Sequence, residues 1–389
     1  MLKVGIDSLA FYTARYSLDL AVLAAARGVA ADKYQTSLGQ HTMSVLPPGE
    51  DVVTLAANAA QQALSHASNP NDIAMLLFAT ESGIDQSKSA GIYVHDLLQL
   101  SPHCRIVELK QACYGATAAL QLALPYLREN PNKKILVIAS DIARYGLQST
   151  GESSQGCGAI AFLLSANPRI LAFEPDYGVV TENVMDFWRP NYRHEALVDG
   201  KYSSKLYLTL LEKSWKQYQS LSGRDLADHA YHCYHMPVPR LVEKAHQHLF
   251  KIAGQTQAAT DYGVQASLMY GRQIGNSYTA SLYISLASLL DHTTADLTNQ
   301  RVGFYSYGSG CIAEYFSGIV QPGYQNHLHS AYHTQMLAAR QPLSYDEYEQ
   351  FYQFQYIEDG SLQTIPLCQT GLYRLAKIEQ HKRVYSPRI

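Results

Sequence analysis

The chain has 389 residues, of which 47% are hydrophobic and 16% are charged, and its formal net charge at pH 7 is -3. This length exceeds that of an ordinary single domain, so we expect two domains or two closely joined halves around a large core. The composition excludes a disordered or tail-dominated chain, and the small net charge argues against a nucleic-acid partner.

Residues 1–10 form a short strand-like pattern without a basic leader, and no apolar run approaches membrane-spanning length. We therefore expect a cytoplasmic protein with no membrane contact. The six cysteines lie far apart and form no Cys-x-x-Cys pair, which argues against a metal site and against a disulfide framework. A cysteine with a special role is then expected to be a nucleophile.

Three short apolar runs, at residues 73–79, 134–139 and 158–164, predict strands that are buried on both faces. Helix-length segments at 87–100 and 113–128 lie between them. This alternation predicts a mixed α/β fold.

The segment that begins at Cys113 resembles the one that begins at Asn276, and both predict a helix rich in small residues. Each is followed by a strand-like segment and then by a glycine-containing turn, at residues 156–158 and 308–310. A duplicated half would leave this pattern. Two unrelated buried helices with Ala-rich packing faces explain it equally well.

Cys113 follows a strand-like segment at 105–109 and lies where residues 111–116 are expected to turn into a helix. Unpaired backbone amides at a helix start favour a thiolate and lower the pKa of a cysteine, and small neighbours admit a thioester. Cys113 is therefore a candidate nucleophile. A buried apolar cysteine is the alternative, and it is the commoner role of a cysteine taken alone.

Glu81 ends an apolar strand, where a nearby apolar pocket can raise the pKa of a carboxylate and make it a general acid or base. The alternative is a helix-entry acid that faces water. His235 ends a strand-like segment just before a helix near Pro239, where an imidazole can donate to a carbonyl oxygen. With 15 histidines in the chain, an ordinary structural role is the alternative.

Further polar residues follow these candidates. Arg240 and Lys244 lie four apart on the predicted helix, and they suit either the phosphates of coenzyme A or a solvated basic face. The Asn276 amide can donate to a carbonyl oxygen or cap a helix. Ser309 lies in the turn at 307–310, whose backbone amides suit an oxyanion hole, although any tight turn uses such glycines.

Eight motifs occur in an order and setting that resemble the hydroxymethylglutaryl-CoA synthase family in its bacterial form, from the first strand to about Tyr315. They are residues 80–88 (TESGIDQSK), 112–117 (ACYGAT), 141–145 (DIARY), 186–190 (DFWRP), 198–201 (VDGK), 235–237 (HMP), 275–276 (GN) and 307–310 (YGSG). The segment after about Tyr324 has no motif that indicates its role.

The resemblance implies a five-layered αβαβα thiolase fold built from two related halves, and a homodimer. The halves are residues 1–166, with Glu81 and Cys113, and residues 167–389, with His235 and Asn276. The resemblance also implies an acyltransferase that condenses acetyl-CoA with acetoacetyl-CoA and water to 3-hydroxy-3-methylglutaryl-CoA and CoA, in the mevalonate pathway to isoprenoid precursors. No cofactor is implied, because the CoA thioesters are substrates.

The same resemblance implies a role for each catalytic residue. Cys113 takes the acetyl group as a thioester, Glu81 removes a methyl proton from it, and His235 positions and polarises the acceptor ketone. The supporting residues are Asp85, Asp141, Asp186, Tyr145, Asn276 and Ser309. The expected substrate or CoA contacts are Ser154, Ser203, Arg240, Lys244, Asn276 and Ser309.

Three rival functions remain at this point. A thiolase or a ketoacyl-carrier synthase also uses a cysteine at a helix start, but the Glu81 motif and the residues around His235 favour the synthase. A polyketide β-branching relative takes its acceptor on an acyl carrier protein. A catalytically inactive scaffold with the same fold is the third, and intact Cys113, Glu81 and His235 argue against it.

Overall fold

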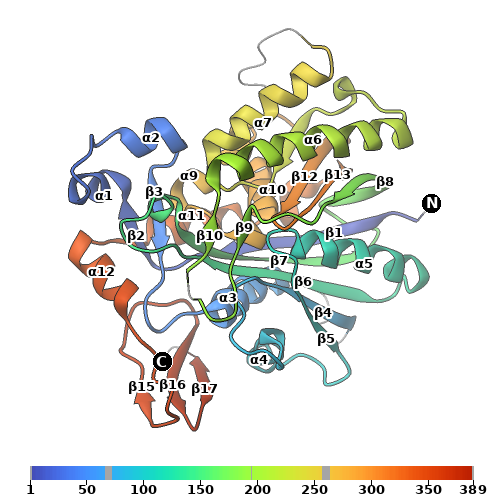
Figure 1. Cartoon of the computed structure of the whole chain (residues 1–389). Helices are drawn as coiled ribbons and strands as arrows, with labels where there is room; N and C mark the ends of the chain where they lie inside the picture. Colours follow the sequence, from blue (N-terminus) through green and yellow to red (C-terminus); the bar gives the residue numbers. More distant parts are fainter. Residues whose placement is uncertain (1, 66–71, 194, 256–262, 388–389) are drawn as a thin grey trace.

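The computed structural model describes residues 2–65, 72–193, 195–255 and 263–387. Helices and strands alternate in stacked layers (Figure 1). Helices α6 (Gly200–Ser222) and α7 (Pro239–Ile252) lie at one end of the stack, and α3 (Val52–Leu64) and α4 (Ala90–Leu97) lie at the other. The predicted mixed α/β class is confirmed.

The strands of the large sheet fall into two groups with the same internal order. The first is β1 (Val4–Tyr12), β7 (Gly156–Ala166), β6 (Lys134–Ala143), β4 (Ile73–Ala79) and β5 (Arg105–Leu109), and the second is β8 (Leu171–Thr181), β13 (Ile312–Val320), β12 (Arg301–Gly308) and β11 (Tyr231–Tyr234). In both groups the first three strands pair antiparallel and the next pair is parallel. A short pairing of Gly5 and Ile6 with β8 joins the groups.

Two helices form the layer between these groups, α5 (Gly115–Glu129) and α10 (Ser281–His292). The Thr117 and Tyr283 hydroxyls join them at 3.0 Å, and the ring of Tyr283 packs on Phe162 of β7. The five αβαβα layers are thus present. The repeated strand order favours duplicated halves as the origin of the sequence echo, while the division at residue 166 stays a prediction.

Three predicted element boundaries differ from the structure. Helix α4 begins at Ala90, because Ser89 caps the N–H of Gly91. Helix α10 begins at Ser281, because Tyr278 has a φ of 45° and Tyr278–Ala280 form a 3-10 turn (η4). The glycines at 156–158 begin β7 instead of forming a turn.

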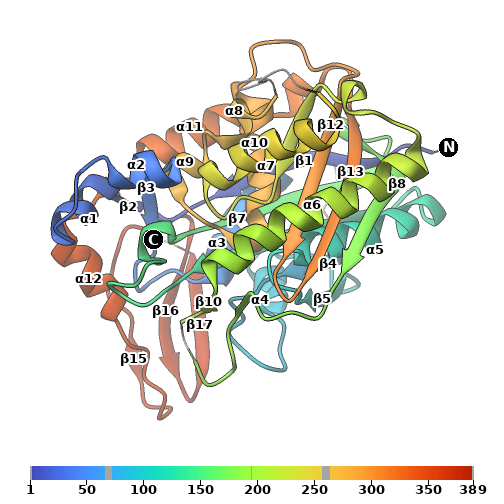
Figure 2. The same ribbon diagram turned by 45° about the horizontal axis from the view of Figure 1, so that its top comes forward.

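The C-terminal segment packs back on N-terminal elements. Helix α12 (Tyr345–Gln353) lies beside α1 (Leu20–Ala26) in Figures 1 and 2, and α11 (Ser330–Ala338) packs on β1 through the bond from the Phe11 N–H to His333 Nε2, at 3.2 Å. The remaining elements are β2 (Tyr16–Asp19), α2 (Lys33–Leu38), β3 (Thr42–Val45), η2 (Glu152–Ser154), β9 (Phe187–Trp188), β10 (Leu197–Val198), η3 (Leu226–Asp228), α8 (Gln265–Leu268), α9 (Gly271–Ile274), η5 (Tyr324–His327), β14 (Gln341–Pro342), β15 (Gln363–Thr364), β16 (Tyr373–Glu379) and β17 (Lys382–Pro387).

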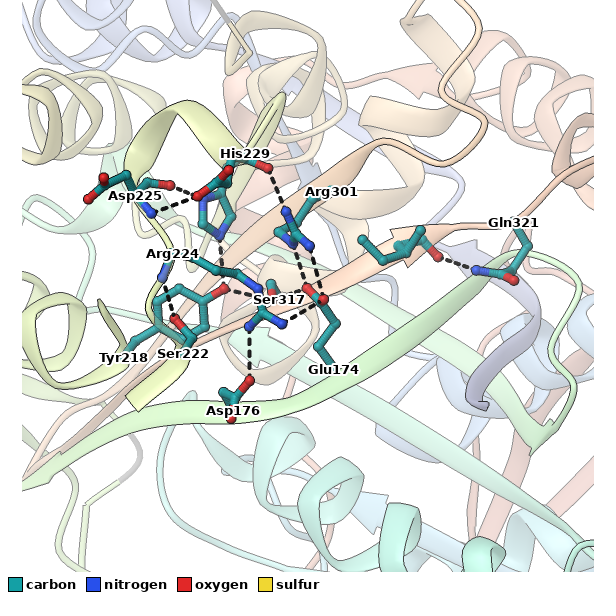
Figure 3. A network of polar contacts seen from close by, with 12 residues as sticks. Glu174, Asp176, Tyr218, Ser222, Arg224, Asp225, His229, Arg301, Ser317 and Gln321 are labelled. Atoms are coloured by element: carbon teal, nitrogen blue, oxygen red, sulfur yellow. Dashed lines mark hydrogen bonds and ion pairs between the residues drawn. The ribbon is translucent and has the colours of Figure 1, made fainter. Parts of the chain in front are cut away.

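A polar network fastens the second strand group to the end of α6 (Figure 3). Glu174 on β8 accepts two hydrogen bonds from Arg301, at 2.7 and 3.1 Å, and pairs with Arg224 at 3.0 Å. The Ser317 hydroxyl donates to the same carboxylate at 2.6 Å. Although burial opposes ionisation, these donors and charges hold the pKa of Glu174 below its ordinary value.

No helix within the described ranges combines the length and the apolar character that crossing a bilayer requires.

Candidate active site

Cys113 lies in a tight turn immediately before α5. The turn is closed by the bond from the Tyr114 N–H to the Gln111 carbonyl, at 3.1 Å, and Ala112 within it has a φ of 44°. The first helical residue is Gly115, so the predicted position at a helix start is confirmed. The Cys113 Sγ donates to Glu81 Oε1 at 3.1 Å.

Glu81 follows β4 by two residues, which confirms that it lies at a strand end. Burial and the nearby Asp141 carboxylate raise the pKa of Glu81 to about 8, although the Cys113 thiol and Arg189 oppose the shift. Arg189 donates to the backbone carbonyl of Glu81, not to its carboxylate. Because this pKa lies close to neutral pH, the Glu81 side chain can both accept and release a proton there.

The Cys113 thiol departs from expectation. Burial, followed by the Glu81 carboxylate, raises the pKa of Cys113 well above its ordinary value. The predicted lowering by the helix start is therefore wrong for this state, because loss of solvation and an adjacent anion outweigh the backbone amides. The thiol needs a base in contact with it, and Glu81 has that position.

Asp141 fixes the loop that contains Glu81. Its Oδ1 accepts from the Thr80 hydroxyl and from the N–H groups of Glu81 and Ser82, each at 2.9 Å. Its Oδ2 accepts from the N–H of Thr279 at 3.1 Å and from the Thr279 hydroxyl. One fully buried carboxylate thus connects the end of β4 to the turn before α10.

His235 follows β11 and precedes α7, as predicted. Burial lowers the pKa of its imidazole to about 3, so the ring is neutral at neutral pH. Its Nδ1 lies 2.6 Å from Ser281 Oγ, and its ring stacks against Tyr307 with centroids 6.4 Å apart. A neutral imidazole can act as a hydrogen-bond donor without placing a positive charge beside a ketone.

Asp186 connects the His235 side of the site to the turn at 307–310. Its carboxylate accepts from the Tyr307 hydroxyl at 2.6 Å, from the Ser203 hydroxyl at 2.9 Å and from the Gly310 N–H at 2.9 Å. The Gly310 amide is therefore occupied and does not serve the predicted oxyanion hole. The Ser203 hydroxyl, a predicted CoA contact, instead supports Asp186.

Gly308 brings this turn against the Cys113 turn. A Cβ on Gly308 would lie 2.6 Å from the Gln111 carbonyl oxygen and 2.6 Å from Tyr114 Cβ, so no larger residue fits there. Ser309 lies beside it and accepts a hydrogen bond from the Gln111 side chain at 3.3 Å through its carbonyl. The adjacent residues Tyr307 and Gly308 thus join the His235 and Cys113 parts of the site.

Tyr145, Asn276 and Ser154 form a second side of the site. The Tyr145 and Tyr278 rings both pack on Phe187, with centroids 6.3 and 5.7 Å away. Asn276 Oδ1 accepts from the Tyr278 N–H at 2.8 Å, so its oxygen caps the η4 turn, and its own N–H donates to the Ser154 carbonyl at 3.3 Å. The Ser154 hydroxyl donates to Gly151 at 2.8 Å.

The hydrogen bonds of three expected residues do not involve Cys113, Glu81 or His235. Asp85 is exposed, and its carboxylate accepts from the N–H groups of Ser87 and Lys88, each at 2.8 Å. Arg240 pairs with Glu243 at 2.5 Å and donates to the Thr36 carbonyl of α2 at 3.2 Å. Lys244, one turn further along α7, is exposed. Their predicted roles remain predictions.

Helix α12 contacts the loop that contains Tyr145. The Tyr352 hydroxyl donates to the Tyr145 carbonyl at 2.6 Å. Gln155 accepts from the Tyr145 N–H at 2.8 Å and donates to the Tyr348 hydroxyl, also at 2.8 Å. A cavity of about 1260 Å³ lies between this helix and Glu81, and Cys113 and His235 are outside its lining.

Four residues that contact the candidates have no role indicated by the sequence. Arg189 and Tyr307 lie within two of the family motifs, and Ser281 and Thr279 follow Asn276 in the repeated segment. Their position beside recognised motifs could have indicated that these residues lie near the site. Their contacts could not be predicted, because each joins residues at least 46 positions apart in the sequence.

Comparisons with known proteins agree with the site. The family model described as hydroxymethylglutaryl-coenzyme A synthase N terminal matches residues 2–169, and the corresponding C-terminal model matches residues 248–388. The chain is 41% identical to a hydroxymethylglutaryl-CoA synthase of Enterococcus faecalis, over 90% of this chain and 91% of that protein.

Two further similar proteins have names that indicate different substrates, one bound to a carrier protein and the other to coenzyme A. A polyketide biosynthesis 3-hydroxy-3-methylglutaryl-ACP synthase, PksG of Bacillus subtilis, is 34% identical over 90% of this chain and 88% of its own length. The solved structure of MvaS in complex with 3-hydroxy-3-methylglutaryl coenzyme A superposes with a TM-score of 0.92 and 37% identity, covering 100% of this chain and 99% of that one. This chain therefore belongs to the hydroxymethylglutaryl-CoA synthase family.

Proposed function

We propose that the protein condenses acetyl-CoA with acetoacetyl-CoA and water to give 3-hydroxy-3-methylglutaryl-CoA and CoA, a step of the mevalonate pathway. The contact between Cys113 Sγ and Glu81 Oε1, at 3.1 Å, is the observation that supports this chemistry most directly. A thiol and a carboxylate in contact can form a thioester and then an enolate from it. The similarity to the Enterococcus enzyme and to MvaS supports CoA thioesters as substrates.

The first step transfers the acetyl group. The Glu81 carboxylate accepts the thiol proton of Cys113 as the sulfur attacks the thioester carbonyl of acetyl-CoA. The carbon–sulfur bond to CoA then breaks, and the CoA thiolate takes the proton from Glu81. Acetyl-Cys113 and a free carboxylate remain, so the same base is ready for the next step.

The second step forms the carbon–carbon bond. Glu81 removes a methyl proton from acetyl-Cys113, and the resulting enolate carbon attacks the ketone of acetoacetyl-CoA. His235 donates a hydrogen bond to the ketone oxygen, where negative charge develops, and the proton held by Glu81 passes to that oxygen. Water then cleaves the Cys113 thioester, leaving the product acid and the free thiol.

The other polar residues have positioning or binding roles in this proposal. Asp141 orients the Glu81 loop, and Asp186 orients the turn that contains Ser309. Arg240 and Lys244 are proposed to attract the CoA phosphates, with Lys244 the more accessible of the two because Arg240 already pairs with Glu243. The reaction is proposed to need no cofactor.

The proposed assembly is a homodimer. Strand β5 pairs with β4 on one side, and its outer edge has no partner strand within the described residues. Val107 on β5 is 45% exposed, and Ile92 on the adjacent α4 is 41% exposed. An unpaired edge with apolar neighbours is a surface that a second copy can cover. The expected cytoplasmic location also remains a prediction.

One assay tests the proposed function. Release of the CoA thiol from acetyl-CoA plus acetoacetyl-CoA is expected, together with a product of the mass of 3-hydroxy-3-methylglutaryl-CoA. The same assay with an acetoacetyl acyl carrier protein tests the PksG-type alternative. Efficient use of the carrier-bound acceptor with little use of acetoacetyl-CoA would replace our proposal with that one.

A further inference from the structure

Ser281 is the first residue of α10, and its hydroxyl is the direct neighbour of the His235 imidazole. His235 Nδ1 lies 2.6 Å from Ser281 Oγ, and the N–H of Met236 donates to the same oxygen at 3.1 Å. Ser281 is 2% exposed and His235 is 3% exposed, so water does not compete freely for these atoms. Both backbone and side chain of this segment are thus held by one serine.

The two tautomers of His235 place different demands on this hydroxyl. If Nε2 carries the hydrogen, Ser281 donates to Nδ1 and accepts from Met236, so the hydroxyl and amide hydrogens both have partners and only the Nε2 hydrogen stays free for a substrate. If Nδ1 carries it, Ser281 accepts twice, and its own hydrogen has no other acceptor in the described part of the chain. A buried hydroxyl without an acceptor is disfavoured.

We propose that Ser281 is a positioning residue that keeps His235 in the Nε2–H tautomer, so that this ring presents a donor to the acceptor ketone. Among the described residues, Nε2 makes no hydrogen bond, so its hydrogen is available. The opposite tautomer would present a lone pair to the oxygen on which negative charge develops, and that contact is repulsive.

This inference rests on the proposed function, and it separates the two chemical steps. Acetyl transfer to Cys113 involves Glu81 and does not need the ketone donor. Carbon–carbon bond formation does need it. Loss of the Ser281 hydroxyl is therefore expected to slow the second step and to leave the first one intact.

Ser281→Ala tests the proposal, and Ser285→Ala is its matched control. Ser285 lies one turn further along α10, is also buried, and its hydroxyl contacts the Tyr234 carbonyl at 3.4 Å instead of His235. We expect Ser281→Ala to acetylate Cys113 within about twofold of the unmodified protein and to lower kcat for condensation about 10- to 100-fold, by analogy with the loss of an orienting partner of a metal-binding histidine. The control should change neither rate by more than about twofold, as expected of a residue outside the reacting groups.

Nitrogen-15 NMR of histidine-labelled protein reads the tautomer without any assay. The unmodified protein should show His235 with hydrogen on Nε2, and Ser281→Ala should show a tautomer mixture. A native Nδ1–H signal, or condensation by Ser281→Ala at the unmodified rate, would overturn the proposal. Equal loss of acetylation and condensation in both serine variants would also overturn it, as a packing effect. If the unmodified protein failed to condense acetoacetyl-CoA at all, the proposed function would fail, whereas the tautomer signal would still test Ser281.

Discussion

Two partly buried glutamates in this protein have opposite surroundings. Glu174 accepts from Arg301 and Ser317 and pairs with Arg224, and these partners hold its pKa below the ordinary value. Glu81 contacts a thiol and has Asp141 nearby, and burial raises its pKa to about 8. A carboxylate that pairs with cations, as Glu174 does, stabilises the packing of the elements around it. A carboxylate with few favourable partners, as Glu81 has, can exchange a proton near neutral pH.

The largest expected effect comes from removing the partner of the reactive glutamate. Cys113→Ala should abolish acetyl transfer, because no other residue in the proposal accepts the acetyl group, and the small change in volume should leave the fold intact. Intact-mass measurement after incubation with acetyl-CoA should show no adduct on this variant. An acetyl group on another cysteine would remove Cys113 from the role of nucleophile.

Glu81→Gln is expected to reduce condensation by about 10²- to 10⁴-fold, the usual contribution of a general base. The amide keeps the shape and removes the base. Acetylation should fall less, because loss of the adjacent negative charge removes one cause of the raised pKa of Cys113, and the thiol can then lose its proton to water. Rapid-quench measurement of acetyl-Cys113 and of product separates the two steps, and substantial product formation would show that Glu81 is not the base.

The paired glutamate should behave in the reverse way. Glu174→Gln leaves Arg301 and Arg224 with less compensation, and we expect the free energy of unfolding to fall by about 1–3 kcal/mol, between the values for an exposed and a fully buried ion pair, because these side chains are partly exposed. Condensation by the folded fraction should be unchanged. Chemical denaturation with Glu81→Gln as the reference checks the contrast, and equal stability of the two variants would contradict it.

The two groups also predict opposite pH effects. The folded pKa of Glu174 lies below its ordinary 4.5, so its contribution to stability is present above pH 4.5 and is lost as pH falls below that value. The folded pKa of Glu81, about 8, lies above 4.5, so stability from this group falls as pH rises from 4.5 to 8. The rate of acetylation should rise through pH 8, and Glu81→Gln should remove that rise.

The sequence predicted the strands and the local settings of Glu81 and Cys113 because both have local signals. The apolar run before Glu81 predicted a strand end, and the small residues around Cys113 predicted a helix start. The direction of the Cys113 pKa shift could not be predicted in this way. It depends on contact with Glu81 and on the packing of Gly308, 195 positions away in the sequence, against Gln111 and Tyr114 on either side of Cys113.

The roles of Ser281 and of α12 could not be predicted from the sequence either. Nothing in the residues near Ser281 indicates that His235 is its partner, and no motif marks the tyrosines of α12. Their hydroxyls become meaningful only when the C-terminal segment folds back on residues 145–155. Long-range packing decides such contacts, and a single sequence has no direct record of them.

Glu152 is a fully buried glutamate that can be compared with Glu174 and Glu81. It pairs with Arg27 through two hydrogen bonds, at 2.6 and 2.8 Å, so it resembles Glu174, but it lies in the loop between Tyr145 and Gln155. The Tyr348 hydroxyl donates to it at 3.1 Å and accepts from Gln155 at 2.8 Å. The Glu152 network thus lies beside the Tyr145 part of the site, and the charge of Glu152 is balanced by Arg27.

Tyr348→Phe should therefore have the smallest effect. It removes one donor to Glu152 and leaves the Gln155 amide without that acceptor, so we expect a loss of about 1 kcal/mol in the free energy of unfolding, typical of one hydrogen bond. KM for acetyl-CoA should rise about two- to fivefold as the Tyr145 loop loosens, with kcat almost unchanged, since uniform binding is what is lost. Tyr345→Phe is the control, because its hydroxyl contacts Arg27 and Glu349 but not Gln155. A fall in kcat as large as that of Glu81→Gln would place Tyr348 in the chemistry and show that a compensated carboxylate beside the site does not guarantee a purely structural role.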